Sequence, residues 1–171
     1  MVKDKRHANV MADYIKYLGD YYLDAEAYYV HYKIERYADV VSFEYDDESD
    51  KIIIVLTEIK SYITDIGQTI RQVKASVKSF EKSNKELIHK LLGDAMVKLS
   101  KKTGKTFILS KDNYYVKGRL VLPLTKQTIQ QIKKYRDLLK GIETFFLAKD
   151  KDKLILVNIK DDSWKKMQLY A

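Results

Sequence analysis

The sequence predicts a mixed α/β domain that begins with antiparallel strands, and three observations support this fold class. Apolar residues recur at helical spacing in residues 4–18 and 66–80. The run 52–56 is apolar on both faces, which is typical of a central strand in a covered sheet. Short segments rich in β-branched and aromatic residues alternate with polar turns. In chain order the segments read α-β-β-β-α-α-β-β-α-β-β, a mixed central sheet flanked by helices.

The first third of the chain is predicted to hold one helix and three strands. The helix covers residues 4–18, and Gly19 is expected to end it. Three segments rich in Tyr, Val and Ile follow as strands, at 21–34, 38–45 and 51–60. The acidic run 46–50 is a turn, so the last two of these strands are expected to form an antiparallel hairpin.

The rest of the chain is predicted to alternate helices and strands. Thr64 or Asp65 caps a helix whose apolar stripe is Ile66, Ile70, Val73, Val77 and Phe80. The remaining predicted elements are a helical segment at 87–99, strands at 106–110 and 119–124, a helix between Thr125 and Gly141, and strands at 142–148 and 153–159.

Length and composition restrict the class of protein. A chain of 171 residues is expected to form one domain, with its core motifs in residues 1–80 and a strand-helix-strand-strand tail at 105–160. The absence of Cys excludes disulfide scaffolds, Cys-ligated metal sites and cysteine catalysis. The longest aliphatic run is too short to cross a bilayer, and no apolar signal core follows the basic N-terminus. We therefore expect a cytoplasmic protein, with no membrane partner.

The formal charge of +8 is divided unevenly along the chain. Residues 1–60 hold 8 Lys+Arg and 13 Asp+Glu, a balance of −5, whereas residues 61–171 hold 24 and 11, a balance of +13. Of the 32 basic residues, 27 are Lys and 5 are Arg. This excess of Lys favours contact with phosphates over reading of base edges. A nucleic acid is therefore the expected partner.

Three charged residues are expected to meet at one end of the predicted hairpin. A turn centred near Glu48 places residue i opposite 96 − i or 97 − i, so that Asp39 faces Thr57 or Glu58. Directly opposed residues have Cβ atoms about 4.5–5.5 Å apart. Glu58 and Lys60 are two positions apart on one strand and therefore point to the same face.

This combination of residue types suits metal-dependent phosphate chemistry. Two close carboxylates repel each other unless a cation or a proton lies between them. Their oxygens suit Mg²⁺ or Mn²⁺, which keep several waters and accept phosphate oxygens. A neighbouring Lys can orient a water or offset charge on the phosphate. The alternative is an ordinary cross-strand cluster of charges at an exposed sheet end.

The pattern resembles the PD-(D/E)xK, or restriction-endonuclease-like, nuclease superfamily, whose core is α-β-β-β-α-β. Asp39 opens the second predicted strand, and Glu58-Ile59-Lys60 closes the third as a (D/E)-x-K motif; Ala38 replaces the usual Pro. The resemblance covers the first eighty residues and continues weakly in the tail. It implies that Asp39, Glu58 and the Ile59 backbone carbonyl bind Mg²⁺ or Mn²⁺, and that Lys60 positions or activates the attacking water.

Further roles follow from the same resemblance. Some members carry Gln-x-x-x-Tyr on the next helix; here Gln68 matches, and Gln72 stands in place of Tyr. Gln68 is therefore expected to support the substrate or a water. Many members add an acid or a His from the first helix or strand. Glu26 is kept as a candidate ligand, although the predicted pairing places it far from Asp39, and His7 is interpreted as a surface residue.

The basic residues after the motif are expected to bind DNA. Arg71, Lys74 and Lys78 lie on one helix face, opposite the apolar stripe. A second group, Lys111, Lys117 and Arg119, extends this surface. A solvated helix face is the alternative interpretation. The DNA substrate is duplex, single-stranded or branched, and both endonuclease and exonuclease activity remain open.

The leading function is thus a divalent-metal-dependent deoxyribonuclease. The alternatives are a catalytically inactive nuclease-fold protein that binds DNA as a scaffold, and a basic interaction protein with a structural charge cluster. Many of the fourteen Tyr lie between residues 21 and 32, where some are expected to form a homodimer surface. The Lys-, Ile- and Tyr-rich composition suits an AT-rich genome, such as that of a thermophilic archaeon or an archaeal virus.

Overall fold

The computed structural model describes residues 5–24, 38–46, 48–82, 85–104, 106 and 114–170. The helices of this part are α1 (Lys5–Asp24), α2 (Ile66–Lys82), α3 (Lys85–Thr103) and α4 (Lys126–Tyr135), with two 3₁₀ helices, η1 (Arg136–Leu139) and η2 (Asp162–Lys166). The strands are β1 (Val40–Asp46), β2 (Lys51–Ile59), β3 (Tyr114–Pro123), β4 (Glu143–Asp150) and β5 (Lys153–Asn158).

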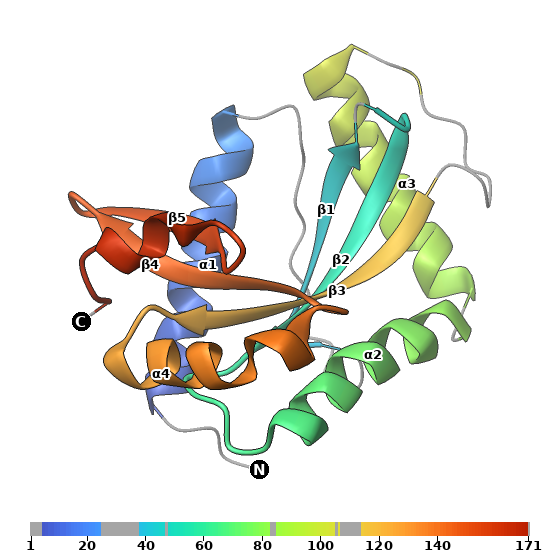
Figure 1. Cartoon of the computed structure of the whole chain (residues 1–171). Coiled ribbons are helices and arrows are strands. Elements are labelled where there is room, and N and C mark those ends of the chain that lie inside the picture. The colour runs from blue at the N-terminus through green and yellow to red at the C-terminus, as the bar shows by residue number, and fades with distance from the viewer. Residues whose placement is uncertain are drawn as a thin grey trace.

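The strands form one curled, mixed sheet with the order β1-β2-β3-β4-β5 (Figure 1). β1 pairs with β2 and β4 with β5 in antiparallel fashion, whereas β2, β3 and β4 run parallel. Helices α2 and α3 connect β2 to β3, and α4 connects β3 to β4, as parallel neighbours require a crossover. The α/β class with a mixed sheet is therefore confirmed.

Helix α1 covers one face of the sheet and the other helices cover the opposite face (Figure 1). On the α1 face, Val10, Tyr14 and Leu18 are almost fully buried against strand residues that include Val40 and Ile59. These helix residues are spaced by four, so they form one stripe along the helix.

Two apolar clusters fill the opposite face. The first is centred on β1 and β2 and includes Phe43, Ile54 and Leu56 packed against Phe80 of α2 and Leu92 of α3. The second lies between β3, β4, α2 and α4, with these members fully or nearly fully buried: Val73, Leu120, Leu122, Ile132, Leu139, Phe146 and Trp164. The sheet is therefore covered on both faces, as its apolar central strand requires.

The predicted hairpin and helix starts are confirmed. β1 and β2 pair with Val40 opposite Thr57, and every pair in the register sums to 97. In the turn, Asp46 accepts hydrogen bonds from the Glu48 backbone N–H at 3.1 Å and the Ser49 hydroxyl at 2.7 Å. Asp65 caps α2 by accepting from the Gln68 N–H, at 3.0 Å.

The C-terminal half also follows the prediction closely. Thr125 and Thr128 form a capping box at the start of α4, and η1 continues that helix to Leu139. β3 starts at Tyr114, five residues earlier than predicted. The last two predicted strands are present as β4 and β5.

The first helix is longer than predicted, because α1 continues through Gly19 to Asp24. A glycine inside a helix costs only about 1 kcal/mol, and the buried stripe of α1 offsets a penalty of that size. The strand predicted to begin at Tyr21 is therefore wrong for residues 21–24. Residues 25–34 of that strand, and residues 107–110 of another, lie outside the described residues, and Thr106 is not in a strand.

In the described part of the chain, no helix is long and apolar enough to cross a membrane.

We predict that Gly118→Ala destabilises the protein, because α2 packs tightly over this glycine of β3. A Cβ at this position would lie 2.6 Å from Val73 Cγ1 and 3.2 Å from Val77 Cγ2. We expect the free energy of unfolding in urea to fall by about 1–3 kcal/mol. Gly93→Ala on α3 is the control, because its Cβ would meet nothing within 4 Å and should stabilise the helix by up to about 1 kcal/mol. Equal effects of the two changes would contradict this packing.

Candidate active site

The start of β1 and the end of β2 bring Asp39 to the Glu58-Ile59-Lys60 motif. The Asp39 backbone N–H donates to the Thr57 carbonyl at 3.1 Å, which extends the hairpin by one residue. The Ile59 backbone N–H in turn donates to Asp39 Oδ2 at 2.9 Å. Asp39 is only 9% exposed. Its carboxylate is thus tied to the middle peptide of the motif, as the predicted register requires.

Glu58 and Lys60 project from the same face of β2 and form an ion pair. Lys60 Nζ lies 3.6 Å from Glu58 Oε1, and the two side chains are 28% and 14% exposed. The Lys60 backbone N–H donates to the Val121 carbonyl of β3 at 3.1 Å, which fixes the strand end that carries both charges. The predicted grouping of Asp39, Glu58 and Lys60 at one end of the hairpin is present in the structure.

The first turn of α1 contributes a further residue to this site. His7 Nε2 lies 3.4 Å from Asp39 Oδ2, and His7 is 8% exposed. Beside it, the Arg6 guanidinium lies 5.1 Å from the ring centroid of Tyr62, which follows the motif. The interpretation of His7 as a surface residue is therefore wrong. A signal for its burial was present in the sequence, because His7 precedes Val10 and Tyr14 on the same helical stripe.

The donor atoms at this end of the hairpin suit one class of metal ion. Among the described residues, no three His, Cys, Asp or Glu side chains converge into a metal-binding group. A structural zinc site needs such a full set of protein ligands. Mg²⁺ differs, because it is held by one or two carboxylates together with waters and phosphate oxygens. The two carboxylates of Asp39 and Glu58 therefore fit Mg²⁺ or Mn²⁺.

Other predicted site residues fall in different places. Gln68 is exposed in the first turn of α2. The Oε1 atom of Gln72, which replaces the Tyr of the related motif, is buried without a hydrogen-bond partner in the structure as described. Glu26 and Lys111 lie outside the described residues, and so do the side chains of the Tyr-rich stretch 21–32.

The two predicted DNA-binding groups do not share one surface. Arg71, Lys74 and Lys78 are exposed on α2, as predicted. Lys117 and Arg119 instead lie on the α1 face of the sheet, away from α2, and Arg119 is only 4% exposed. A buried guanidinium cannot contact a phosphate backbone, so the extension of the DNA surface to these two residues is not supported by their placement.

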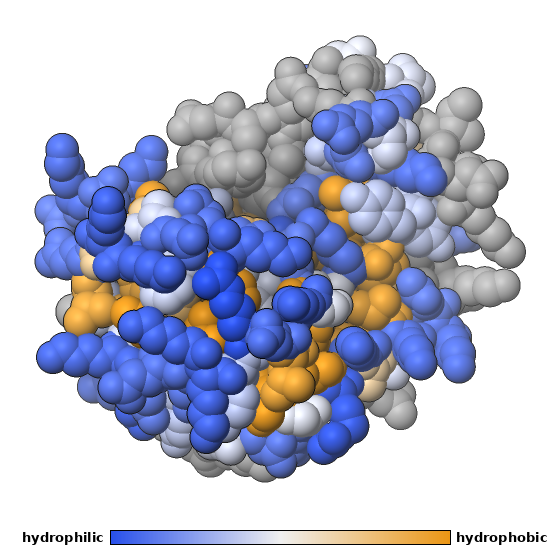
Figure 2. Space-filling model, in the orientation of Figure 1, coloured by the Kyte–Doolittle hydropathy of each residue, from blue (hydrophilic) through white to orange (hydrophobic). Residues whose placement is uncertain are grey.

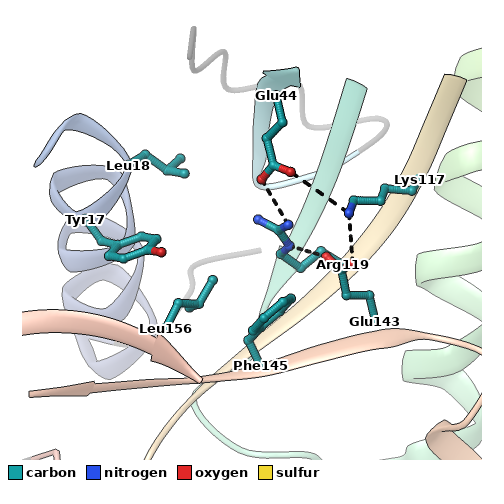
Figure 3. Close-up of a pocket in the computed structure, with 8 residues that line it drawn as sticks. All are labelled: Tyr17, Leu18, Glu44, Lys117, Arg119, Glu143, Phe145 and Leu156. Atoms are coloured by element: carbon teal, nitrogen blue, oxygen red, sulfur yellow. Dashed lines mark hydrogen bonds and ion pairs between the residues drawn. The ribbon is translucent and has the colours of Figure 1, made fainter. Parts of the chain in front are cut away.

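Lys117 and Arg119 belong to a compact network of four charges (Figure 3). Arg119 donates to Glu44 at 3.0 Å and to Glu143 at 2.6 Å, and Lys117 donates to Glu143 at 2.8 Å. These side chains line a cavity of about 420 Å³ whose other walls are Tyr17, Leu18, Phe145 and Leu156. The charges of the two bases and the two acids balance within the network.

The ionisation of this network favours the charged forms. Burial alone would raise the pKa of the Glu143 carboxyl, but Arg119 and Lys117 outweigh burial and hold its pKa below the usual value. Burial also opposes the charge on Arg119, yet Tyr14 and the two glutamates raise its pKa well above the usual value. The ion pairs therefore persist at neutral pH.

A buried hydrogen-bonded chain connects this network to the candidate site. Arg119 donates to the Tyr14 hydroxyl at 3.2 Å, and that hydroxyl lies 3.0 Å from Thr57 Oγ1. Thr57 directly precedes Glu58 and accepts from the Asp39 N–H through its carbonyl. Tyr14 thus fastens α1 to β2 two helical turns from His7, which fixes the helix that places His7 against Asp39.

Comparisons with known proteins found no match to this chain among protein-family models, curated proteins or solved structures.

We predict that Glu143→Gln lowers the free energy of unfolding by about 1–2 kcal/mol at neutral pH, because Arg119 loses one of its two carboxylates in a partly buried site. The pKa of Glu143 is lowered by folding, so its contribution is fully present above the usual value of 4.5 and is lost as the pH falls through the folded value. The difference between the two proteins should therefore shrink below pH 4.5 in a series of urea titrations.

Glu48→Gln is the matched control, since it makes the same charge change in the exposed turn between β1 and β2. It should alter stability by less than about 0.5 kcal/mol. A loss of stability that is equal for the two variants, or independent of pH, would contradict the assigned role of Glu143.

Proposed function

We propose that this protein is a divalent-metal-dependent deoxyribonuclease that hydrolyses phosphodiester bonds in DNA. The observation that carries the proposal is the 2.9 Å hydrogen bond from the Ile59 N–H to Asp39 Oδ2. It joins an isolated acid to the centre of a (D/E)-x-K motif that lies 20 residues further along the chain. Ion-pair clusters at sheet ends do not require such a bond, whereas a two-carboxylate metal site needs both acids held together.

The order of elements supports a PD-(D/E)xK-type fold. A helix, an antiparallel hairpin, a helical crossover and a strand parallel to the second hairpin strand follow one another as α1, β1, β2, α2–α3 and β3. This matches the α-β-β-β-α-β core with its first strand at residues 25–34, outside the described residues. Asp39 then opens the second core strand, and Glu58 ends the third.

Each residue of the site has a specific role in this proposal. Asp39, Glu58 and the Ile59 carbonyl would hold Mg²⁺ or Mn²⁺, which supplies a lowered pKa for water and positive charge against the phosphate. Lys60, now paired with Glu58, would position the attacking water and offset charge on the phosphate. Gln68, exposed on the first turn of α2, would contact the substrate or a water.

His7 acts on the carboxylate of Asp39. An ionised carboxylate only accepts hydrogen bonds, so the ring nitrogen of His7 at 3.4 Å is the donor. This contact orients Asp39 from the side opposite the Ile59 peptide and limits the rotation of its carboxylate. Fixing the first ligand in this way lowers the cost of assembling the metal site.

The proposed DNA surface begins beside the site on α2. This helix starts seven residues after Ile59, and its exposed Arg71, Lys74 and Lys78 face solvent. Lysine-rich surfaces contact the phosphate backbone without selecting a base sequence. The substrate is therefore DNA recognised by its backbone and shape, in duplex, single-stranded or branched form. Cutting both strands of a duplex would involve two copies of the chain.

A second candidate function, a DNA-binding protein without nuclease activity, is favoured by one observation. Lys60 is occupied by Glu58 and Asp39 by His7, so the charges at the site partly satisfy one another without a metal ion. Such a protein would keep the DNA surface on α2 and would not cut.

The experiment that separates these functions incubates the protein with supercoiled, linear, single-stranded and junction DNA. Each substrate is tested with Mg²⁺, with Mn²⁺ and with a chelator. We expect cutting only with a metal ion, and a decrease of roughly 100-fold or more in its rate for Asp39→Asn, Glu58→Gln and Lys60→Gln.

Glu48→Gln and Lys151→Gln are matched controls for loss of one acid and one base in exposed turns, and they should cut at the wild-type rate. Metal-dependent cutting that survives in all three site variants would overturn the assignment of the site. Binding to DNA without cutting of any substrate would favour the second candidate.

A further inference from the structure

We propose that α4 and η1 carry a second part of the DNA-binding surface, which continues the basic face of α2. This inference rests on the proposed function, because it takes the same DNA as the partner. Helices α2 and α4 lie on the same face of the sheet (Figure 1). They share one apolar cluster, in which Val73 of α2 packs together with Ile132 of α4 and Leu139 of η1. Their solvent faces therefore form parts of one side of the molecule.

Two contacts join α4 and η1 to the neighbourhood of the candidate site. The side-chain amide of Gln131 accepts from the Ile63 N–H at 2.8 Å and donates to the Ile63 carbonyl at 2.6 Å. Ile63 lies in the connection between Lys60 and α2, so α4 is tied to the segment that leaves the motif. At the far end, Lys74 Nζ of α2 reaches within 3.7 Å of where a Cβ of Gly141 would lie.

The solvent face of α4 and η1 is strongly basic. Lys126, Lys133 and Lys140 recur every seven residues and are exposed, and so is Lys134. Asp137 is the acidic residue between Lys126 and Gly141, and it pairs with Lys140 at 3.5 Å. The residues 126–140 rise by roughly 20 Å at 1.5 Å per helical residue. This length is enough to follow several successive phosphates.

The cations on this side differ from those in the sheet in having no carboxylate partners. In the described part of the chain, no ion pair neutralises Arg71, Lys74, Lys78, Lys126 or Lys133. Lys117 and Arg119, by contrast, are each paired with two glutamates. Hydrophilic residues dominate the side of the molecule drawn in Figure 2, around a narrow apolar strip. A group of unneutralised Lys residues on one side favours a polyanion, and the adjoining site identifies it as DNA.

The test compares two double variants in DNA binding, with a chelator present so that no strand is cut. Lys126→Gln/Lys133→Gln removes two charges from α4. Lys151→Gln/Lys153→Gln removes two exposed charges from the β4–β5 hairpin, where Asp150 and Asp152 lie beside them. Binding of a short labelled duplex and of its single strand is measured by fluorescence anisotropy over a series of salt concentrations. Thermal melting followed by circular dichroism checks that both variants fold.

For the α4 variant we expect a Kd increased about tenfold and a salt slope, log Kd against log salt, reduced by about 2. The hairpin variant should bind within about twofold of wild type, because its lysines are not on the proposed surface. Equal binding by the two variants, or a salt slope unchanged in the α4 variant, would overturn the inference.

The same experiment distinguishes this inference from the proposed function. Cutting that persists while the α4 variant binds like wild type would leave the nuclease and remove the α4 surface. Absence of cutting, together with weakened binding by the α4 variant alone, would leave the surface and remove the nuclease.

Discussion

The antiparallel register of β1 and β2 is the constraint on which the candidate site depends. Because Val40 lies opposite Thr57, Asp39 meets the end of β2 and accepts the hydrogen bond from the Ile59 N–H. A slip of one residue would turn every side chain of one strand to the other face. It would bury Glu58 against α1 and expose the apolar residues that now pack under α2 and α3. The two-sided burial of β2 therefore holds the charged motif in position at the strand end.

The basic residues of this protein have two different fates, and burial decides between them. Lys117 and Arg119 extend from a central strand between Glu44 and Glu143, where removal from water requires close partners. The lysines of α2 and α4 stay in water, so they need no carboxylate and can exchange counterions for phosphates. The net charge of the chain is therefore not spread over one surface. It is cancelled on the α1 face of the sheet and remains available on the side of α2 and α4.

Local patterns predicted the parts of the structure that short-range physics determines. The acidic turn, the apolar strand and the caps of α2 and α4 follow from neighbouring residues alone, and so does the meeting of Asp39 with the motif. The continuation of α1 past Gly19 depends on tertiary packing, which overrides one weak helix former. The burial of Arg119 depends on Glu44 and Glu143, distant in sequence, and on the strand order that makes them neighbours. His7 was missed because its place on the buried stripe of α1 was given less weight than its position near the terminus.

The most direct test of the account is the binding of Mn²⁺ to the purified protein without DNA, measured by isothermal titration calorimetry. Asp39 and Glu58 are the carboxylates proposed to hold the ion, whereas Glu143 belongs to the separate charge network on the other face. The account predicts one bound Mn²⁺ per chain, lost in Asp39→Asn and in Glu58→Gln and retained in Glu143→Gln. No binding by the wild-type protein, or binding that is unchanged in both site variants, would contradict it.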